Sequence, residues 1–212
     1  MMKNSLYILF CMISMYACSD KEYMQRFADI KYTGETNPIQ GIQTNGFYVE
    51  ADKDSDNSVF IFYNDGTFVR TFLRYKLNSL MTTKPVNLNK AVQKWGRKSR
   101  HWGQSYGLYK IVKDTIYVTQ YNRYAWYYDI AKYKYKIIDT ENILLCFCEI
   151  PSLKQRERYL FENLNEKFTF VPADSIPSPD NGFLKKEKWY WENKSDWINY
   201  RRKKHGDSNF AL

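Results

Sequence analysis

A serine between two glycines is the first group in this chain that could do covalent chemistry. The stretch "GQSYG", residues 103 to 107, has the Gly-x-Ser-x-Gly spacing of a nucleophile elbow, where a sharp strand-to-helix turn lifts the serine into an oxyanion hole. The residues after Ser105 alternate as in a strand, and those before it are basic and loop-like. A triad would have only His101 and His205 as bases. We therefore expect no catalytic residues and a protein that is not an enzyme.

Two thiols and several carboxylates give equally weak signals for chemistry. Cys146 and Cys148, in "LLCFCEI", would point to the same face of a strand, and no histidine or second cysteine pair lies nearby to complete a zinc site. We expect them to be small buried apolar residues, with no metal or cofactor. Paired carboxylates for glycoside cleavage would have to face each other across a cleft. The acids of the predicted strands are scattered: Glu50, Asp129, Glu149 and Glu162.

Aromatic side chains are the remaining candidates for a binding site. The chain has 19 Tyr, 13 Phe and 6 Trp, a composition that favours β structure because aromatic residues fit a pleated, half-buried surface. A barrel lined by tyrosines could hold a small apolar or aromatic ligand, or the rings could fill the interior themselves. Both alternatives stay open at this stage. The tyrosines in question are Tyr106, Tyr109, Tyr117, Tyr133 and Tyr135.

Cys18 is placed to carry a lipid. It follows a short apolar run from Leu6 to Tyr16 that begins after Lys3, which is the layout of a secretory signal and is too short for a membrane span. The pair Ala17-Cys18 resembles the end of a bacterial lipoprotein signal, whose cysteine is acylated after cleavage just before it. This resemblance implies a membrane-anchored protein, and the charged residues after Cys18 are similar to surface-export signals of Bacteroidetes lipoproteins. We expect an outer-membrane location, facing either the periplasm or the cell surface.

The chain is basic, with a formal net charge of +9. No acid occurs from Lys84 to Lys113, and the C-terminal part carries the run from Arg201 to Lys204. Such patches suit an anionic envelope glycan or lipid, or they serve only as a solvated surface. We do not expect nucleic acid as a partner of an exported protein.

The elements that must position these residues are predicted to be antiparallel strands. Residues 58–73 form two aromatic and β-branched runs around Asn64-Asp65-Gly66, a strong hairpin signal. Alternation continues from residue 105, through a turn at Lys113-Asp114, into "YDIAKYKYKII" and "ILLCFCEI". Residues 158–164 and 167–173 are predicted to pair as a hairpin across Asn165-Glu166. Residues 76–104 break the pattern and include a candidate helix at 88–95.

These strands predict an all-β fold: an antiparallel up-and-down meander that closes into a lipocalin-like barrel of about eight strands, with a sandwich as the alternative. We expect a signal peptide at 1–17, a tether leading into the domain at 18–45, the barrel at 46–173 and a basic Trp-rich extension at 174–212. In the extension, Ser195 is predicted to cap a helix that ends at His205. We expect three tryptophans to pack back on the barrel: Trp189, Trp191 and Trp197.

Two further stretches carry a resemblance. The signal, the segment "WGQSYGLYKIVKDTI" at 102–116 and the closing "FVPADSIPSPDNGFLKKEKWYW" at 170–191 together resemble uncharacterised Bacteroidetes outer-membrane lipoproteins with a lipocalin-like β-barrel. The resemblance covers most of the chain after Cys18. Because its motifs are turn and packing residues, it implies a fold and a compartment, and it supplies no catalytic residues.

Overall fold

The strands of the chain close into one antiparallel barrel. The computed structural model describes residues 28–33, 41–50, 57–73, 86–87, 104–123, 128–151, 158–176 and 182–205, together with Gln25. Eight strands make the barrel, and a ninth short one, β4, lies beside it. Their bounds are β1 Gly46–Glu50, β2 Asn57–Phe62, β3 Thr67–Leu73, β4 Val86–Asn87, β5 Gln104–Val112, β6 Thr115–Arg123, β7 Tyr128–Ile137, β8 Asn142–Pro151 and β9 Arg158–Ser175.

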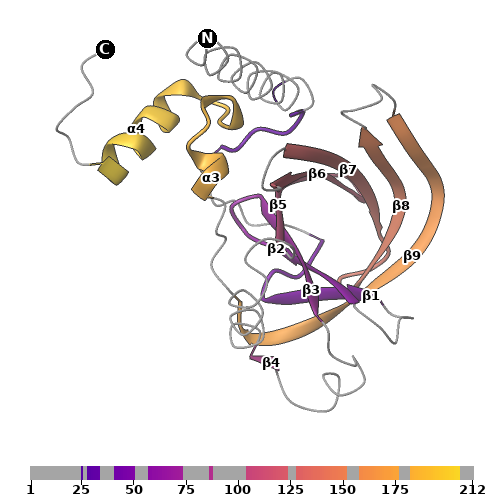
Figure 1. Ribbon diagram of the computed structural model, residues 1–212. Helices are drawn as coiled ribbons and strands as arrows, with labels where there is room; N and C mark the ends of the chain where they lie inside the picture. Colours follow the sequence, from indigo (N-terminus) through magenta and orange to yellow (C-terminus); the bar gives the residue numbers. More distant parts are fainter. Residues whose placement is uncertain are drawn as a thin grey trace, which may run out of the picture.

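The sheet closes because its first and last strands pair with each other. Neighbours follow in the order β1, β2, β3, β5, β6, β7, β8 and β9, and all of these pairs are antiparallel. β1 then pairs with β9, from Gly46 opposite Pro172 to Glu50 opposite Phe168. Figure 1 looks into the resulting ring of strands. The prediction of an up-and-down, lipocalin-like barrel of about eight strands is therefore confirmed, and the sandwich alternative is excluded.

Three tight turns lie together at one end of the barrel, which we call the turn end. In the β2–β3 turn, Gly66 has φ 77°, a left-handed conformation that glycine adopts without steric cost. Lys113, in the β5–β6 turn, has φ 58°. In the β7–β8 turn, the Asp139 carboxylate accepts hydrogen bonds from the backbone N–H groups of Glu141 and Asn142, both at 2.8 Å. The opposite end, where the longer connections leave the strands, is the loop end.

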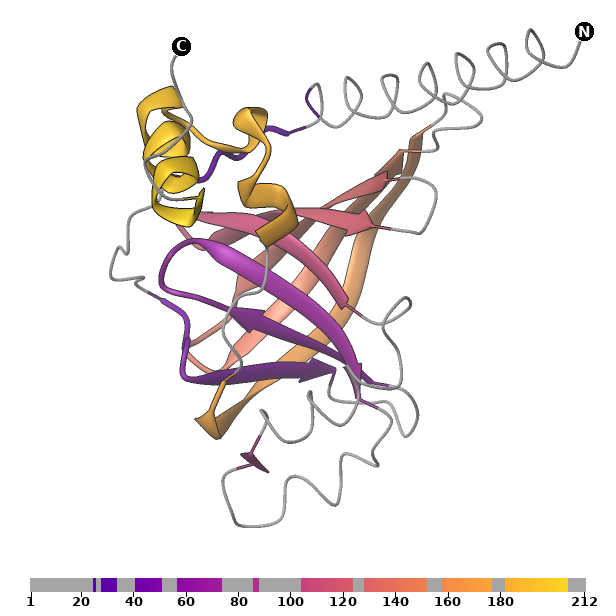
Figure 2. The ribbon, with the colours of Figure 1, turned by 60° about the vertical axis from the view of Figure 1, so that its left-hand side comes forward.

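One predicted hairpin is wrong. Residues 158–175 form the single long strand β9 and do not turn at Asn165-Glu166. The irregularity lies two residues earlier, where Asn163 has φ 56°, and the partner strand β8 also shifts register between Leu145 and Phe147. Paired irregularities of this kind bend two strands together without ending either one. β8 and β9 therefore curve as one long hairpin (Figure 2).

Between β3 and β5, the structure describes only the short strand β4. Val86 and Asn87 pair in parallel with β9 at Ala173 and Ser175. The candidate helix at 88–95 lies outside the described residues, as do Cys18 and the signal segment.

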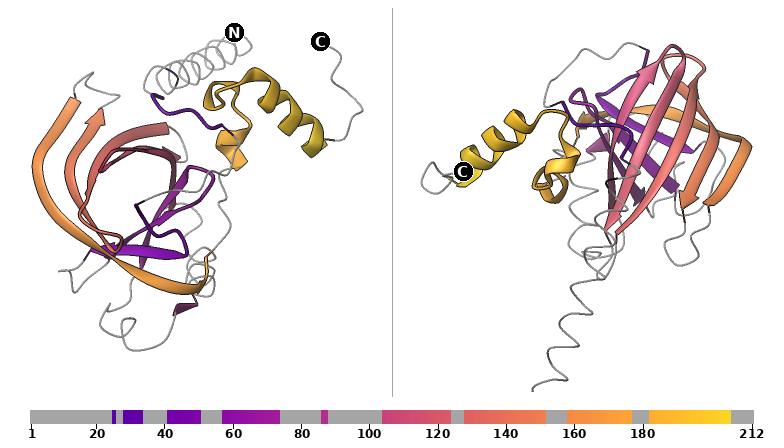
Figure 3. Two further views of the ribbon diagram at one scale, coloured as in Figure 1. Left: turned by 180° about the vertical axis from the view of Figure 1, so that it is seen from behind. Right: turned by 90° about the horizontal axis from the view of Figure 1, so that it is seen from above.

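The C-terminal extension covers one outer side of the barrel. It contains α3 Gly182–Lys185, the 3-10 turn η2 Lys188–Tyr190 and α4 Lys194–His205. α4 begins one residue before Ser195, so Ser195 lies within its first turn and the predicted cap is wrong. Figure 3 shows the three helical pieces gathered outside the strands, next to the described segment 28–33. The backbone of Tyr32 makes hydrogen bonds to the residues before and after Trp191. Its N–H donates to the Tyr190 carbonyl and its carbonyl accepts from the Glu192 N–H, both at 2.9 Å.

Candidate functional site

The five predicted tyrosines do not line one cavity. Three of them, Tyr109, Tyr133 and Tyr135, belong to the buried cluster inside the barrel. Tyr106 and Tyr117 point the other way and pack against a second cluster on the outer face of β5, β6 and β7. The expectation that all five line the interior is therefore wrong for these two. Alternation already separated Tyr106 from Tyr109. Both faces of β5 carry buried residues, Leu108 on the outside and Tyr109 on the inside.

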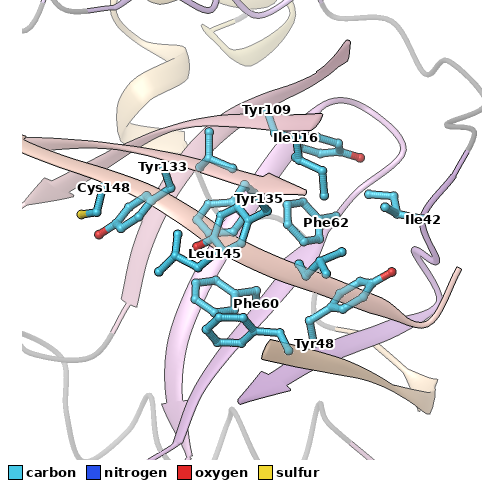
Figure 4. Packing of buried hydrophobic residues seen from close by; sticks show 14 of the residues in the cluster. Ile42, Tyr48, Phe60, Phe62, Tyr109, Ile116, Tyr133, Tyr135, Leu145 and Cys148 are labelled. Atoms are coloured by element: carbon cyan, nitrogen blue, oxygen red, sulfur yellow. The ribbon is translucent and has the colours of Figure 1, made fainter. Parts of the chain in front are cut away.

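Aromatic rings occupy the interior of the barrel. Phe60, on β2, lies at the centre with a ring-centroid distance of 4.8 Å to Phe168 in an edge-on arrangement. It lies 5.6 Å from both Phe68 and Tyr135. Such edge-to-face and offset contacts are the favourable geometries for aromatic pairs. Figure 4 shows the rings packed against one another across the barrel, and Phe60, Phe68, Tyr135 and Phe168 are all at most 2% exposed.

At the turn end, two tyrosine hydroxyls are tied to the backbone. The Tyr109 hydroxyl donates to the Tyr63 carbonyl at 2.8 Å. The Tyr48 hydroxyl accepts from the Gln43 N–H at 2.9 Å and donates to the Thr140 carbonyl at 3.4 Å. Burial raises the pKa of Tyr48 to about 12 and the pKa of Tyr109 still further. Both hydroxyls thus stay protonated and hold neighbouring segments together at this end.

Toward the loop end, the interior carries an arginine that the sequence analysis missed. Arg70 lies on β3, two residues after the inward-facing Phe68, and its guanidinium donates to the Tyr133 hydroxyl at 3.1 Å. The same guanidinium lies 5.4 Å from the ring centre of Phe60 and 5.8 Å from that of Tyr133. The sequence "TFVRTFL" could have pointed to Arg70, because it places a charged residue at an inward position of an apolar strand. Burying a charge there is costly unless the surrounding residues stabilise it.

Cys148 sits beside this arginine. It lies directly opposite Tyr133 in the β7–β8 pairing and is buried. Burial raises the pKa of the Cys148 thiol to about 11, although Arg70 acts in the opposite direction. Cys148 is thus a buried neutral thiol, as predicted from its apolar context. Its neighbour Cys146 is partly exposed and directs its Sγ at the Leu144 carbonyl, 3.3 Å away.

The candidate chemical groups do not assemble into a reactive set among the described residues. Ser105 lies within β5, opposite Arg70 on β3, and not at a turn from a strand into a helix. His101 lies outside the described residues. Within the described ranges, no group of three or more His, Cys, Asp or Glu is arranged to hold a metal ion.

The outer cluster fastens the C-terminal extension to the barrel wall. Its buried members come from three places: the segment 28–33, the outer faces of β5–β7, and the extension. Tyr190 and Trp191 pack on Tyr32 with ring-centroid distances of 5.5 and 4.9 Å. The indole N–H groups of Trp191 and Trp197 donate to the Lys185 and Lys186 carbonyls.

Basic residues of the extension remain on its surface. The exposed ones are Lys186, Lys188, Lys194, Arg202, Lys203 and Lys204. Lys185 differs, because it is partly buried with its ammonium 4.7 Å from the Tyr32 ring, and this burial lowers its pKa. The exposed side of the extension is therefore rich in positive charge, in agreement with the sequence pattern.

Comparison of the chain with protein-family models, with curated proteins and with solved structures finds no match. None of the helices in the described ranges combines the length and hydrophobicity that a membrane span requires.

Proposed function

We propose that this protein is a lipid-anchored lipoprotein of the cell envelope that acts without catalysis, as a binding or structural module. The signal-like segment that ends in Ala17-Cys18 supports the anchor, with Cys18 as the acylated residue and the outer membrane as the location. The resemblance to Bacteroidetes lipoproteins with lipocalin-like barrels supports the same compartment.

The observation that carries the functional part of the proposal is the aromatic filling of the barrel. A carrier of the lipocalin type would enclose its ligand in the interior. Here the centre of the interior is taken up by rings in van der Waals contact, among them Phe60, Phe68 and Phe168, which are almost completely shielded from solvent. Recognition by this barrel is therefore assigned to its ends and its outer surface, and a deep carrier site is disfavoured.

The anchor is tested with the full chain expressed in a bacterium that processes lipoproteins. We expect the intact mass to start at Cys18 and to include acyl chains, and the protein to sediment with membranes. Cys18→Ser should abolish acylation, because the variant lacks the thiol that carries the lipid. Without the acyl chains, the protein should no longer be held at the membrane. Cys146→Ser, a partly exposed thiol on β8, is the matched control and should remain anchored. A mass that starts elsewhere, or an unmodified Cys18, would refute the anchor.

The exposed basic side of the extension is proposed to contact anionic envelope glycan or lipid. Such contacts are electrostatic and weaken as salt is added. We expect the purified protein to bind vesicles containing phosphatidylglycerol more tightly than neutral phosphatidylcholine vesicles, with the difference reduced by Arg202→Gln combined with Lys203→Gln. Equal binding to both kinds of vesicle would exclude a lipid role and leave the glycan to be tested by the same variants.

A further inference from the structure

The early part of β9 has one edge that no described strand covers. β8 pairs with the first edge of β9 from Arg158 onward. On the second edge, β1 pairs only from Phe168 to Pro172, and β4 pairs beyond it. In Figure 2, β9 runs from the lower side of the barrel, beside β1, to the far tip of the β8–β9 hairpin. Among the described strands, none borders the second edge of β9 at residues 158–167.

Three consecutive apolar residues lie on this uncovered stretch. Tyr159, Leu160 and Phe161 are 44%, 55% and 46% exposed. Because side chains alternate along a strand, Tyr159 and Phe161 share one face and Leu160 lies on the other. Tyr159 and Phe161 lie opposite Ile150 and Cys148 on β8 and so continue the inner face of the barrel. Both faces of the strand are therefore apolar and exposed at the same place.

The features that normally protect an edge strand come only after these three residues. Such protection consists of charged side chains, prolines or bulges, and an apolar edge without it is a template for pairing with another chain. Glu162, Glu166 and Lys167 are charged and exposed. Asn163, with φ 56°, lies at the irregularity that bends β8 and β9. The edge that is open to pairing is therefore residues 158–162, which we call the edge segment.

The order of residues in the edge segment is self-complementary. If two copies pair antiparallel about a two-fold axis at Leu160, Leu160 lies opposite itself and Tyr159 lies opposite Phe161 twice, and such apolar cross-strand pairs stabilise a sheet. The same register sets Glu162 opposite position 158, which the sequence fills with an arginine. An axis at either of these two positions sets like charges opposite each other. An axis at Tyr159 or Phe161 sets Leu160 opposite a charged residue. Only the register about Leu160 matches apolar with apolar and acid with base.

From this arrangement we propose that the protein forms a homodimer in which the edge segment of one copy pairs with that of a second copy. The interface uses the same patch on both copies, as a two-fold axis requires. The backbone N–H and C=O groups of the second edge of β9 then pair across the axis, and the three exposed apolar side chains are removed from water. A contact this short is small, so we expect a dissociation constant in the micromolar range. The dimer does not depend on the proposed anchor.

The inference is tested by sedimentation velocity of the purified protein over a range of concentrations. We expect monomers at low concentration and dimers at high concentration. Leu160→Glu should weaken dimerisation by about tenfold or more, because it removes the central apolar pair and sets two carboxylates opposite each other. Val112→Glu is the matched control: it places the same charge at a residue that is 47% exposed at the end of β5, and it should leave dimerisation unchanged. A protein that stays monomeric throughout, or a dimer that is equally tight in Leu160→Glu, would overturn the inference.

A mixture of two variants tests the register about the two-fold axis. Leu160→Lys should dimerise as weakly as Leu160→Glu, since like charges again lie opposite each other. In a mixture, an acidic and a basic side chain meet at the axis, and we expect mixed dimers to be severalfold tighter than dimers of either variant. Labelling one variant with a heavy nitrogen isotope lets native mass spectrometry count the mixed dimers. Both variants should fold like the parent, as circular dichroism would show, because Leu160 is exposed. Mixed dimers that are no tighter would show that the copies do not meet at Leu160.

Discussion

Replacing Phe60 by alanine should separate a filled barrel from a hollow one. Phe60 is 2% exposed and contacts the rings of Phe68, Tyr135 and Phe168, with the Arg70 guanidinium above it. Truncation of a buried phenylalanine costs about 3–5 kcal/mol in stability, part of it from the cavity left behind. The lost cation–π contact adds about 0.5–2 kcal/mol. We therefore expect a loss of about 5 kcal/mol, which lowers the folding equilibrium constant about five-thousandfold.

The assay is urea unfolding followed by tryptophan fluorescence, with the midpoint and slope fitted together. The midpoint should fall while the slope stays the same. Val112→Ala is the matched control, because Val112 is 47% exposed at the end of β5 and should change stability by less than about 0.5 kcal/mol. A dry cavity lined by apolar side chains can take up benzene, which then stabilises the folded state. Benzene should thus raise the midpoint of Phe60→Ala and leave the parent unchanged. A loss below about 1 kcal/mol, together with stabilisation of the parent by benzene, would refute a filled interior.

Two further predictions concern ionisation. Burial raises the pKa of six tyrosines above the usual value near 10, so the stability that each contributes is fully present below about pH 10 and falls by up to about 1.4 kcal/mol per pH unit above it. We expect the protein to unfold cooperatively within about two pH units above pH 10, seen as a single step in absorbance at 295 nm. A gradual titration of the tyrosines with the fold intact would contradict this prediction. The six are Tyr32, Tyr48, Tyr63, Tyr109, Tyr121 and Tyr135. Because burial raises the pKa of Cys148 to about 11, only about one Cys148 thiol in a thousand is ionised at pH 8. Iodoacetamide should therefore alkylate Cys148 far more slowly in the folded protein than in urea. Peptide mass spectrometry measures both rates, and equal rates would show that the thiol is accessible in the folded protein.

The strands and their tight turns could be predicted because their signals are local. Asn64-Asp65-Gly66 supplies the residue that tolerates φ 77° at the β2–β3 turn, and the alternation of Lys132 to Lys136 with two tyrosines places Tyr133 and Tyr135 on one face. The hairpin at Asn165-Glu166 failed for the opposite reason. Whether β9 turns or bulges depends on its register with β8, which bulges as well, and a partner strand leaves no mark on the local sequence.

The site was harder to predict than the fold because both faces of several strands are buried. An aromatic on β5 or β6 can face the interior or the outer cluster, and alternation alone does not say which face is inside. Lys132 illustrates the same difficulty. Lysines that alternate with tyrosines along a strand are typical of a solvent-exposed face. The Lys132 side chain is nevertheless only 20% exposed and pairs with Asp29, which precedes it by 103 residues. Contacts between the segment 28–33, the extension and the barrel wall involve residues too far apart in sequence for any local pattern to show them.

The pairing of Tyr32 with the extension has a consequence for how the proposed anchor would hold the barrel. Segment 28–33 and the extension bury one cluster together on the outer faces of β5–β7, so this part of the chain packs on a side wall of the barrel. Cys18 precedes Ala28 by ten residues (28 − 18), a length that spans at most about 35 Å when fully extended. An anchor at Cys18 would therefore keep that side wall, with its exposed lysines and arginines, within reach of the membrane.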